Sequence, residues 1–314
     1  MNQNWTRIGA VDGGELLSGC VRGANHCDKG TPCQDASLAG IHYYRGHPYV
    51  LLAVADGHGS ASYARSEFGA HFAVRAAAEA AARWILFAVA SLEDRPDDWL
   101  PNARNEFGLR FAKLLRQIWE RTVDEHLAAC PLQVAAQDAE SARKVYGTTV
   151  AVALIFHGQM FAGAVGDSTV FLVKDAAGEV AAVDLLTGDK NDALGLATDS
   201  LASADAAYRW KHRVLPLDGV QMVLAATDGF ADSLAEPGRV LASLQQDVQA
   251  KGFHWLRDRL PDFLLRLTGQ GVGDDIATVF YFPPSRRSGL QAATAAEAGN
   301  ESAAGQPSNP SIAA

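Results

Sequence analysis

The stretch LLAVADGHGS (Leu51–Ser60) places a carboxylate and an imidazole directly after a run of apolar residues. Residues 50–55, VLLAVA, contain no polar side chain, as in a strand that is buried on both faces. The run ends at Asp56, and two glycines flank His58. Because Asp-Gly is a common turn dipeptide, this stretch by itself predicts only a buried strand that ends in a turn.

Strand and helix patterns occur in separate blocks around this stretch. Residues 37–50 predict its hairpin partner, with the turn at Arg45-Gly46-His47-Pro48. The Ala-rich residues 61–90 have a high helix propensity, and Ser60 or Ser62 is the expected cap. Further along, the pattern predicts a helix over 104–129 and a loop over 131–144. An antiparallel meander is expected next, with strands over 148–156, 160–165, 169–174 and 180–185. The last predicted elements are a strand over 221–226, helices over 239–249 and 253–267, and a final strand over 276–282. Such blocks favour an α+β layered fold over a doubly wound parallel sheet.

The composition indicates a protein with a sizeable core and an acidic surface. The 314 residues are 48% hydrophobic and carry a net charge of −9, which argues against a nucleic-acid partner. The most apolar segment, residues 84–92, is shorter than the roughly 20 residues that a membrane span needs. Because the start of the chain also has no apolar signal core, we expect a cytoplasmic protein without membrane association. We expect residues 1–283 to form one domain and residues 284–314 to form a disordered low-complexity tail.

The chain has four cysteines, Cys20, Cys27, Cys33 and Cys130, and none of them forms a CxxC pair. Cys27 and Cys33 lie near His26, which raises the alternative of a zinc site. A structural zinc site needs four ligands at closer spacing, so this alternative is disfavoured. Reduced thiols agree better with the expected cytoplasmic location.

Aspartates stand next to several of the predicted strands. Asp56, Asp167 and Asp228 each follow an apolar strand, whereas Asp35 and the pair Asp274-Asp275 precede one. A charged group beside a buried strand costs free energy unless it is paired or binds a metal, and few basic residues lie nearby in the sequence. Oxygen ligands suit Mg²⁺ or Mn²⁺. Two such ions about 4 Å apart can activate a water and hold a phosphoryl group for in-line attack.

These segments, in this order, resemble the metal-dependent protein serine/threonine phosphatases of the protein phosphatase 2C type, and HCDKGTPCQDAS (26–37) resembles the bacterial branch of that family. The resemblance implies a four-layer α-β-β-α sandwich of two antiparallel sheets flanked by helices. It covers residues 18–282, and its matching segments are CQDAS (33–37), VADGHGS (54–60), GTTVAVAL (147–154), AVGDSTVFLV (164–173), LAATDGFAD (224–232) and GDDIATVFY (273–281).

The resemblance also implies a role for each aspartate. Asp56 would bridge two Mn²⁺ or Mg²⁺ ions, and Asp167 would hold a third, more weakly bound ion. Asp35 would order metal-bound water from outside the ligand shell. The implied metal ligands are Asp56, Gly57 through its carbonyl, Asp167, Asp228 and Asp274, with Asp275 as the fallback for Asp274.

The resemblance further implies that hydrolysis would proceed by in-line attack of a metal-bridging water, with Asp56 at the centre of the catalytic site. His58 follows the bridging aspartate and its glycine, where it would act as general acid. A histidine suits this task because the departing serine or threonine oxygen needs a proton. The alternative is that His58 only forms a hydrogen bond to a neighbouring group.

The sequence departs from the family pattern where many members carry a phosphate-binding arginine, since Gly30 occupies that position. Lys29, His26 and Arg22 lie nearby and are the candidates to replace it. Lysine would bind phosphate as a point charge and not as a bidentate fork. Gln34 and Thr169 also stand where members of the family often have glutamate and arginine.

Three functions follow from these observations. The first is a phosphatase acting on phosphoserine and phosphothreonine in proteins, with a bacterial serine/threonine kinase and its substrates as partners. The second is a catalytically weak phosphatase-like module that binds or regulates a partner, favoured by the missing arginine. The third is a phosphoesterase of a small molecule. Neither GxxxxGK[ST] nor HExxH occurs in the sequence, which disfavours nucleotide-binding loops and zinc proteases.

Overall fold

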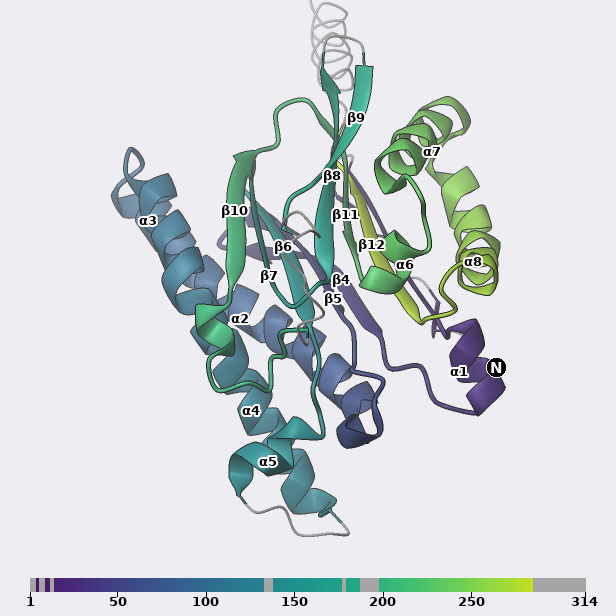
Figure 1. Cartoon of the computed structure of the whole chain (residues 1–314). Helices are drawn as coiled ribbons and strands as arrows, with labels where there is room; N and C mark the ends of the chain where they lie inside the picture. The colour runs from purple at the N-terminus through teal and green to yellow at the C-terminus, as the bar shows by residue number, and fades with distance from the viewer. Residues whose placement is uncertain are drawn as a thin grey trace, which may run out of the picture.

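The computed structural model describes residues 4–5, 9–11, 14–132, 138–176, 179–186 and 198–284. Within these residues two antiparallel sheets pack face to face, and helices cover the outer face of each sheet (Figure 1). The predicted four-layer α+β sandwich is therefore confirmed. The expected tail, residues 284–314, lies outside the described residues except for Pro284, so the domain boundary stays a prediction.

The first sheet contains five strands in the order β10-β7-β6-β5-β4. β4 and β5 form the predicted hairpin, and Arg45 and Gly46 at its turn both have positive φ. β5 and β7 are both antiparallel to β6, so they run in the same direction and end at the same edge of the sheet. The strands are β4 (Ala36–Tyr44), β5 (His47–Ala55), β6 (Val150–Phe156), β7 (Gln159–Val165) and β10 (Lys211–Pro216).

The second sheet contains seven strands in the order β1-β3-β12-β11-β8-β9, with β2 paired to β3. β11 and β12 are antiparallel, with Ala226 opposite Thr278, so the end of β11 lies beside the start of β12. The strands are β1 (Asn4–Trp5), β2 (Gly9–Val11), β3 (Gly14–Val21), β8 (Thr169–Ala176), β9 (Glu179–Asp184), β11 (Val220–Ala226) and β12 (Ile276–Phe282).

The predicted meander over residues 148–185 is wrong at one connection. β6 pairs with β7 in the first sheet, whereas β8 pairs with β9 and β11 in the second. The chain therefore crosses between the sheets at residues 166–168. Every residue of β6, and every residue of β7 after the first, is buried. Such strands lack the polar–apolar alternation that would mark which sheet each one joins.

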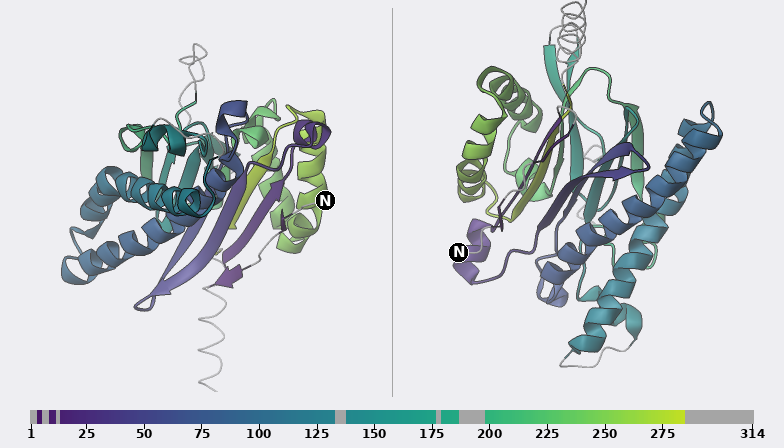
Figure 2. Two further views of the ribbon diagram at one scale, coloured as in Figure 1. Left: turned by 90° about the horizontal axis from the view of Figure 1, so that it is seen from below. Right: turned by 180° about the vertical axis from the view of Figure 1, so that it is seen from behind.

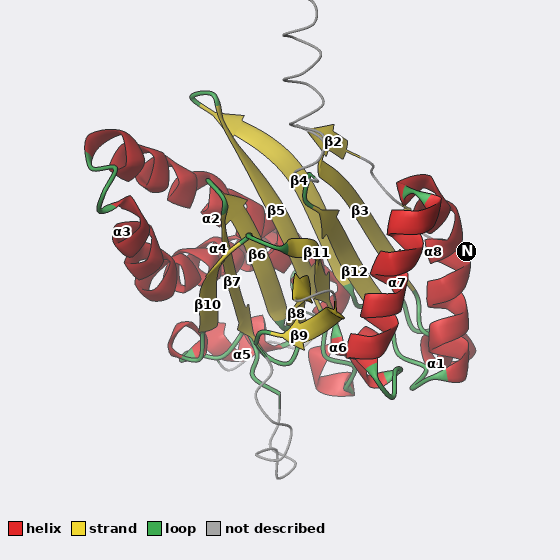
Figure 3. Ribbon diagram, turned by 90° about the horizontal axis from the view of Figure 1, so that it is seen from above, coloured by secondary structure: helices red, strands yellow, loops and turns green. Residues whose placement is uncertain are grey.

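Two helical layers cover the sandwich, as Figures 2 and 3 show from other sides. The layer on the five-stranded sheet consists of α2 (Ser66–Asp94), α3 (Trp99–Glu106), a π-helical segment (Phe107–Phe111) and α4 (Ala112–Ala129). The layer on the seven-stranded sheet consists of α6 (Asp228–Asp232), α7 (Pro237–Lys251) and α8 (Phe253–Gln270). The connections contain α1 (Ala24–Lys29), α5 (Ala139–Lys144) and the 3₁₀ segments Ala61–Tyr63 and Ala206–Tyr208.

Two local predictions about helices are wrong. The helix expected from residue 61 begins at Ser66, after a 3₁₀ segment, and Arg65 occupies its N-cap position. Neither Ser60 nor Ser62 is therefore its cap. The predicted loop over 131–144 contains α5, whose N-cap Asp138 accepts a hydrogen bond from the backbone N–H of Ser141. The capping bond satisfies a backbone donor that would otherwise be unpaired at the start of this short helix.

The long helix α2 lies close to the first sheet because its buried face consists largely of alanine. Gly69 allows the closest approach, since a Cβ atom there would lie 1.9 Å from the carbonyl oxygen of Tyr146. Further along the helix, Trp84 packs edge-on against Phe161 and Phe107. Among the described residues, no helix is both long and apolar enough to cross a membrane.

The close contact at Gly69 predicts that Gly69→Ala lowers the free energy of unfolding by about 1–3 kcal/mol, because the helix must move away from Tyr146. Gly269→Ala is the matched control, since Gly269 lies in α8 and a Cβ atom there would have no neighbour within 4 Å. That change is expected to raise the free energy of unfolding by up to about 1 kcal/mol, since alanine favours helix. Urea unfolding measures both. Equal stability of Gly69→Ala and the wild type would contradict the packing described for α2.

Candidate active site

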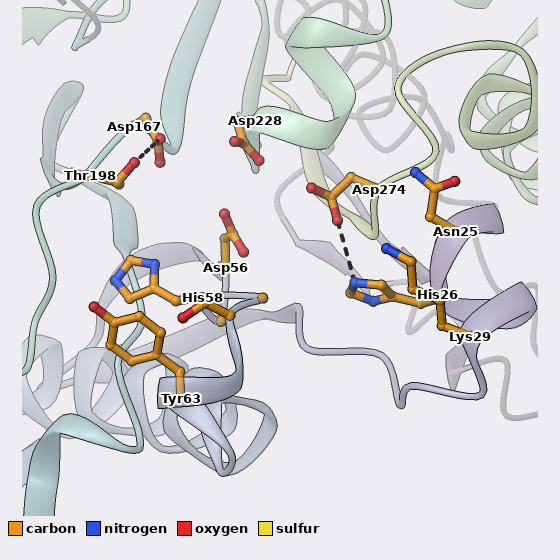
Figure 4. Close-up of a pocket in the computed structure, with 13 residues that line it drawn as sticks. Asn25, His26, Lys29, Asp56, His58, Tyr63, Asp167, Thr198, Asp228 and Asp274 are labelled. Atoms are coloured by element: carbon orange, nitrogen blue, oxygen red, sulfur yellow. Dashed lines mark hydrogen bonds and ion pairs between the residues drawn. The ribbon is translucent and has the colours of Figure 1, made fainter. Parts of the chain in front are cut away.

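Three carboxylates meet at the end of the sandwich where β5, β7 and β11 end. Asp56 follows β5, Asp167 follows β7, and Asp228 follows β11 at the start of α6. One oxygen of each carboxylate lies within 4.8 Å of an oxygen of the other two, and all three side chains are partly buried. Figure 4 shows them facing one another across a cavity of about 450 Å³. The two sheets thus bring together residues from distant parts of the sequence.

The backbone at Asp56 is held by two threonines that precede β6. The Asp56 carbonyl accepts hydrogen bonds from the backbone N–H of Thr149 and the hydroxyl of Thr148, both at 2.8 Å. The Asp56 N–H donates to the Thr149 hydroxyl oxygen at 3.1 Å. At Gly57 a Cβ atom would lie 2.7 Å from the Gln34 carbonyl oxygen, so a larger residue would displace this turn. The carboxylate of Asp56 therefore projects from a fixed position.

The electrostatics of the cluster favour a bound cation. Burial, and then the charges of Asp228, Asp167 and Asp274, raise the pKa of Asp56 well above its usual range. Burial and the neighbouring carboxylates also raise the pKa of Asp228 to about 6. Within the described part of the chain, no lysine or arginine forms an ion pair with Asp56, Asp167 or Asp228. Carboxylates that repel one another without a basic partner are suited to a hard divalent cation.

The two consecutive aspartates before β12 have different surroundings. Asp274 lines the cavity, and its side chain is 53% exposed. The Asp275 side chain is 1% exposed and accepts hydrogen bonds from the backbone N–H groups of Gly23 and Gln34, each at 2.6 Å. It also accepts one from the ring of His26 at 2.8 Å. The structure thus brings Asp274 to the other carboxylates, whereas the fallback ligand Asp275 points away from the cavity.

Asp35 lies behind the cluster and does not line the cavity. It is 4% exposed, and its carboxylate accepts a hydrogen bond from the Thr227 hydroxyl at 2.7 Å. Burial, and then the charge of Asp56, raise the pKa of Asp35 well above its usual range. Asp35 thus lies beside Asp56 and outside the cavity, and its role in ordering metal-bound water stays a prediction.

His58 lies in the cavity wall against an aromatic ring. Its backbone N–H donates to the Gly147 carbonyl at 3.1 Å, and the ring centroids of His58 and Tyr63 are 4.7 Å apart. Nε2 of His58 is buried without a hydrogen-bond partner among the described residues. Burial lowers the pKa of the His58 imidazole, which makes its protonated form a stronger acid.

Of the three basic candidates for phosphate binding, two line the cavity and one does not. Lys29 and His26 line the cavity from α1 (Figure 4). Arg22 does not line it, and its guanidinium donates to the carbonyl oxygen of His26 at 2.7 Å. Gly30 is the C-cap of α1 and has a φ of 71°. The position that carries arginine in many members of the family is therefore, in this chain, a helix-ending glycine in the left-handed backbone conformation.

Five cavity residues were missed by the sequence-based reasoning: Asn25, Gly59, Ser60, Tyr63 and Thr198. Thr198 donates its hydroxyl hydrogen to Asp167 at 2.9 Å. It lies in a part of the sequence without a strand or helix pattern, so nothing there indicated its role. Tyr63 lies five residues after His58, and this closeness in sequence was the one available signal.

The comparisons with known proteins agree with this geometry. A family model described as protein phosphatase 2C matches residues 22–264, and the chain therefore belongs to the protein phosphatase 2C family, as the sequence resemblance predicted. Members of this family are protein serine/threonine phosphatases, and this chain is one of them. A comparison with curated protein sequences finds no significant match.

Solved structures share the fold at low sequence identity. A serine-threonine phosphatase 2C from Toxoplasma gondii is 12% identical over 89% of this chain and 98% of its own, with a TM-score of 0.53. The Mycobacterium tuberculosis serine/threonine phosphatase PstP/Ppp is 15% identical over 87% of this chain and 99% of its own, with a TM-score of 0.50. A sex-determining protein of C. elegans is 17% identical over 88% of this chain and 67% of its own, with a TM-score of 0.52. At these identities the matches establish the fold.

The raised pKa of Asp228 predicts how the stability of the metal-free protein depends on pH. The folded state holds this proton more tightly than the unfolded state, whose pKa is near 3.8. The free energy of unfolding should therefore fall between about pH 4 and pH 6 and remain low at pH 7. Asp228→Asn removes this charge and should raise the free energy of unfolding at pH 7 by about 1–3 kcal/mol.

The measurement is urea unfolding at pH 7 in the presence of a chelator, with Asp97→Asn as control because Asp97 is exposed between α2 and α3. The control should change the free energy of unfolding by less than about 0.5 kcal/mol. A loss of stability in Asp228→Asn under these conditions would contradict the electrostatic picture of the cluster.

Proposed function

We propose that this phosphatase is metal-dependent and hydrolyses phosphoserine and phosphothreonine in proteins. The observation that carries the proposal is the cluster of Asp56, Asp167 and Asp228, whose oxygens lie within 4.8 Å without a lysine or arginine partner among the described residues. The same cavity contains His58 and Lys29, so an ion site, a proton donor and a phosphate-binding charge share one space.

The proposed cofactor is Mn²⁺ or Mg²⁺, because the cluster offers only oxygen ligands. Asp56 would be shared between two ions, with the Gly57 carbonyl on one ion and Asp228 and Asp274 on the other. Asp167 would hold a third ion, and Asp35 would order water behind Asp56. Bound ions would lower the pKa of a water between them for in-line attack and neutralise charge on the phosphoryl group.

Lys29 is the proposed phosphate-binding residue. It is exposed in the cavity wall, and in Figure 4 Asp56 and Asp274 lie between it and the ring of His58. A lysine ammonium attracts phosphate as a point charge and imposes less orientation than an arginine fork. Arg22 is a weaker candidate than Lys29, because it does not line the cavity and its guanidinium already donates to the backbone carbonyl of His26.

His58 is the proposed general acid. The His58 side chain lines the cavity, and the ring of Tyr63 packs against it at a centroid distance of 4.7 Å, which fixes its position, while the buried Nε2 has no hydrogen-bond partner among the described residues. A proton from His58 would go to the serine or threonine oxygen as its bond to phosphorus breaks. We further propose that the substrates are proteins phosphorylated by a serine/threonine kinase in the cytoplasm. The competing function is a catalytically weak phosphatase-like module that binds or regulates a partner, favoured by the glycine at position 30.

The metal site predicts that phosphopeptide hydrolysis requires Mn²⁺ or Mg²⁺, and that Asp56→Ala and Asp228→Ala each lower kcat/KM by at least about 100-fold. Asp97→Ala, at an exposed position, is the matched control and should retain wild-type activity. The measurement is phosphate release from phosphoserine and phosphothreonine peptides. Metal-independent turnover, or turnover that survives both substitutions, would refute the site; absence of turnover in the wild type would favour the binding module.

The general-acid role predicts a dependence on the leaving group. His58→Ala should lower kcat on phosphopeptides by about 100-fold or more, because an alkoxide needs a proton. The same variant should lose less than about tenfold on p-nitrophenyl phosphate, whose leaving group is stable without one. His254→Ala, at an exposed position on α8, is the control for general effects of removing a histidine. Equal losses on both substrates would remove the general acid from the mechanism.

A further inference from the structure

His26 is held in one orientation by a buried carboxylate. Its Nδ1 lies 2.8 Å from Oδ2 of Asp275, and the Asp275 side chain is 1% exposed. The same carboxylate accepts backbone hydrogen bonds from Gly23 and Gln34, so it is fixed by segments on both sides of α1. The His26 side chain itself is 14% exposed and lines the cavity.

The helix that carries His26 is also fastened to the segment before β12. The backbone N–H of Ala24 donates to the hydroxyl oxygen of Thr268 at 3.0 Å, and that hydroxyl donates to the carbonyl of Asp274 at 2.8 Å. The N–H of Asn25 donates to the carbonyl of Gly273 at 2.9 Å. A Cβ atom at Gly23 would lie 2.4 Å from the backbone of Asp274. His26 and Asp274 are thus parts of one rigid unit.

The hydrogen bond to Asp275 decides which ring nitrogen of His26 is free. Both oxygens of the Asp275 carboxylate already accept a backbone N–H, so Nδ1 of His26 is assigned as the donor in the bond between them. In the neutral ring the lone pair is then on Nε2, which lies 3.9 Å from Oδ1 of Asp274 at the cavity (Figure 4). Ligands at about 2.1 Å from one ion can be up to about 4.2 Å apart, so both atoms can bind the same ion.

We propose that Nε2 of His26 is a nitrogen ligand of the metal ion that Asp274 binds, with Asp275 as the residue that positions the ring. The arrangement is that of carboxylate–histidine–metal sites, in which the second hydrogen bond fixes the tautomer and makes the nitrogen a stronger donor. The inference rests on the proposed metal-dependent function and adds a ligand to it. It gives Asp275 a part in the site although its carboxylate lies outside the cavity.

A nitrogen ligand changes which ion the site prefers. Mg²⁺ favours oxygen ligands, whereas imidazole binds transition metals well, and affinity rises from Mn²⁺ through Fe²⁺ to Co²⁺. The site of Asp274 and His26 is therefore expected to select Mn²⁺ or Fe²⁺ over Mg²⁺. The competing assignment for His26 is a contact to the substrate phosphate, and spectroscopy of the bound ion separates the two.

The test uses Mn²⁺ alone as the probe and the full chain as the protein. Electron spin-echo envelope modulation of bound Mn²⁺ detects directly coordinated imidazole nitrogen. The wild type and His58→Gln are expected to show the nitrogen modulation, and His26→Gln is expected to lose it. Calorimetry should show that His26→Gln weakens Mn²⁺ binding by about tenfold or more and Mg²⁺ binding by less than about threefold. Thermal unfolding of the metal-free variants checks that His26→Gln is folded.

The results that would contradict the proposed function differ from those that would contradict only the assignment of His26 as a ligand. Absence of Mn²⁺ binding in the wild type would overturn the proposed metal-dependent function together with this inference. Mn²⁺ bound without nitrogen modulation, or modulation that persists in His26→Gln, would overturn the inference alone. An unchanged Mn²⁺ affinity in His26→Gln, combined with weaker inhibition by inorganic phosphate, would overturn it in favour of a phosphate contact.

Discussion

The repulsion among Asp56, Asp167 and Asp228 is the constraint on which the site depends. Three partly buried carboxylates within 4.8 Å of one another stay together only if the surrounding fold is rigid and stable enough to resist their repulsion. Two packed sheets supply it, because each carboxylate follows a different buried strand and the backbone of Asp56 is fastened to Thr148 and Thr149. The stability of the sandwich thus offsets the electrostatic cost of the cluster, and a divalent cation would remove that cost.

Much of the fold follows from local sequence patterns. The buried strand ending at Asp56, its hairpin partner and the strands before Asp167 and Asp228 are visible as apolar runs. The sheet that each strand joins is not visible, because the strands on either side of Asp167 are buried on both faces and carry no alternation. The edge strand β10 was missed for the opposite reason, since Lys211–Pro216 begins with three polar residues and none of its residues is fully buried.

The candidate site was predictable in its carboxylates and less so in its other residues. Asp56, Asp167, Asp228 and Asp274 stand next to recognisable strands, so their convergence follows once the strands pair. The family resemblance preferred Asp274 to Asp275, and the structure adds a physical difference between them: Asp274 faces the cavity, whereas Asp275 accepts three hydrogen bonds behind it. His26 depends on a short helix without a strong sequence signal, and its orientation depends on Asp275, 249 residues away.

Asp56, the carboxylate that two ions would share, is the centre of the proposed site. A crystal structure of the protein soaked with Mn²⁺, with anomalous diffraction recorded at the manganese edge, tests this most directly. The expected result is two anomalous peaks about 4 Å apart, both within bonding distance of Asp56. Manganese bound elsewhere on the protein, with no peak beside Asp56, would contradict the shared-carboxylate site.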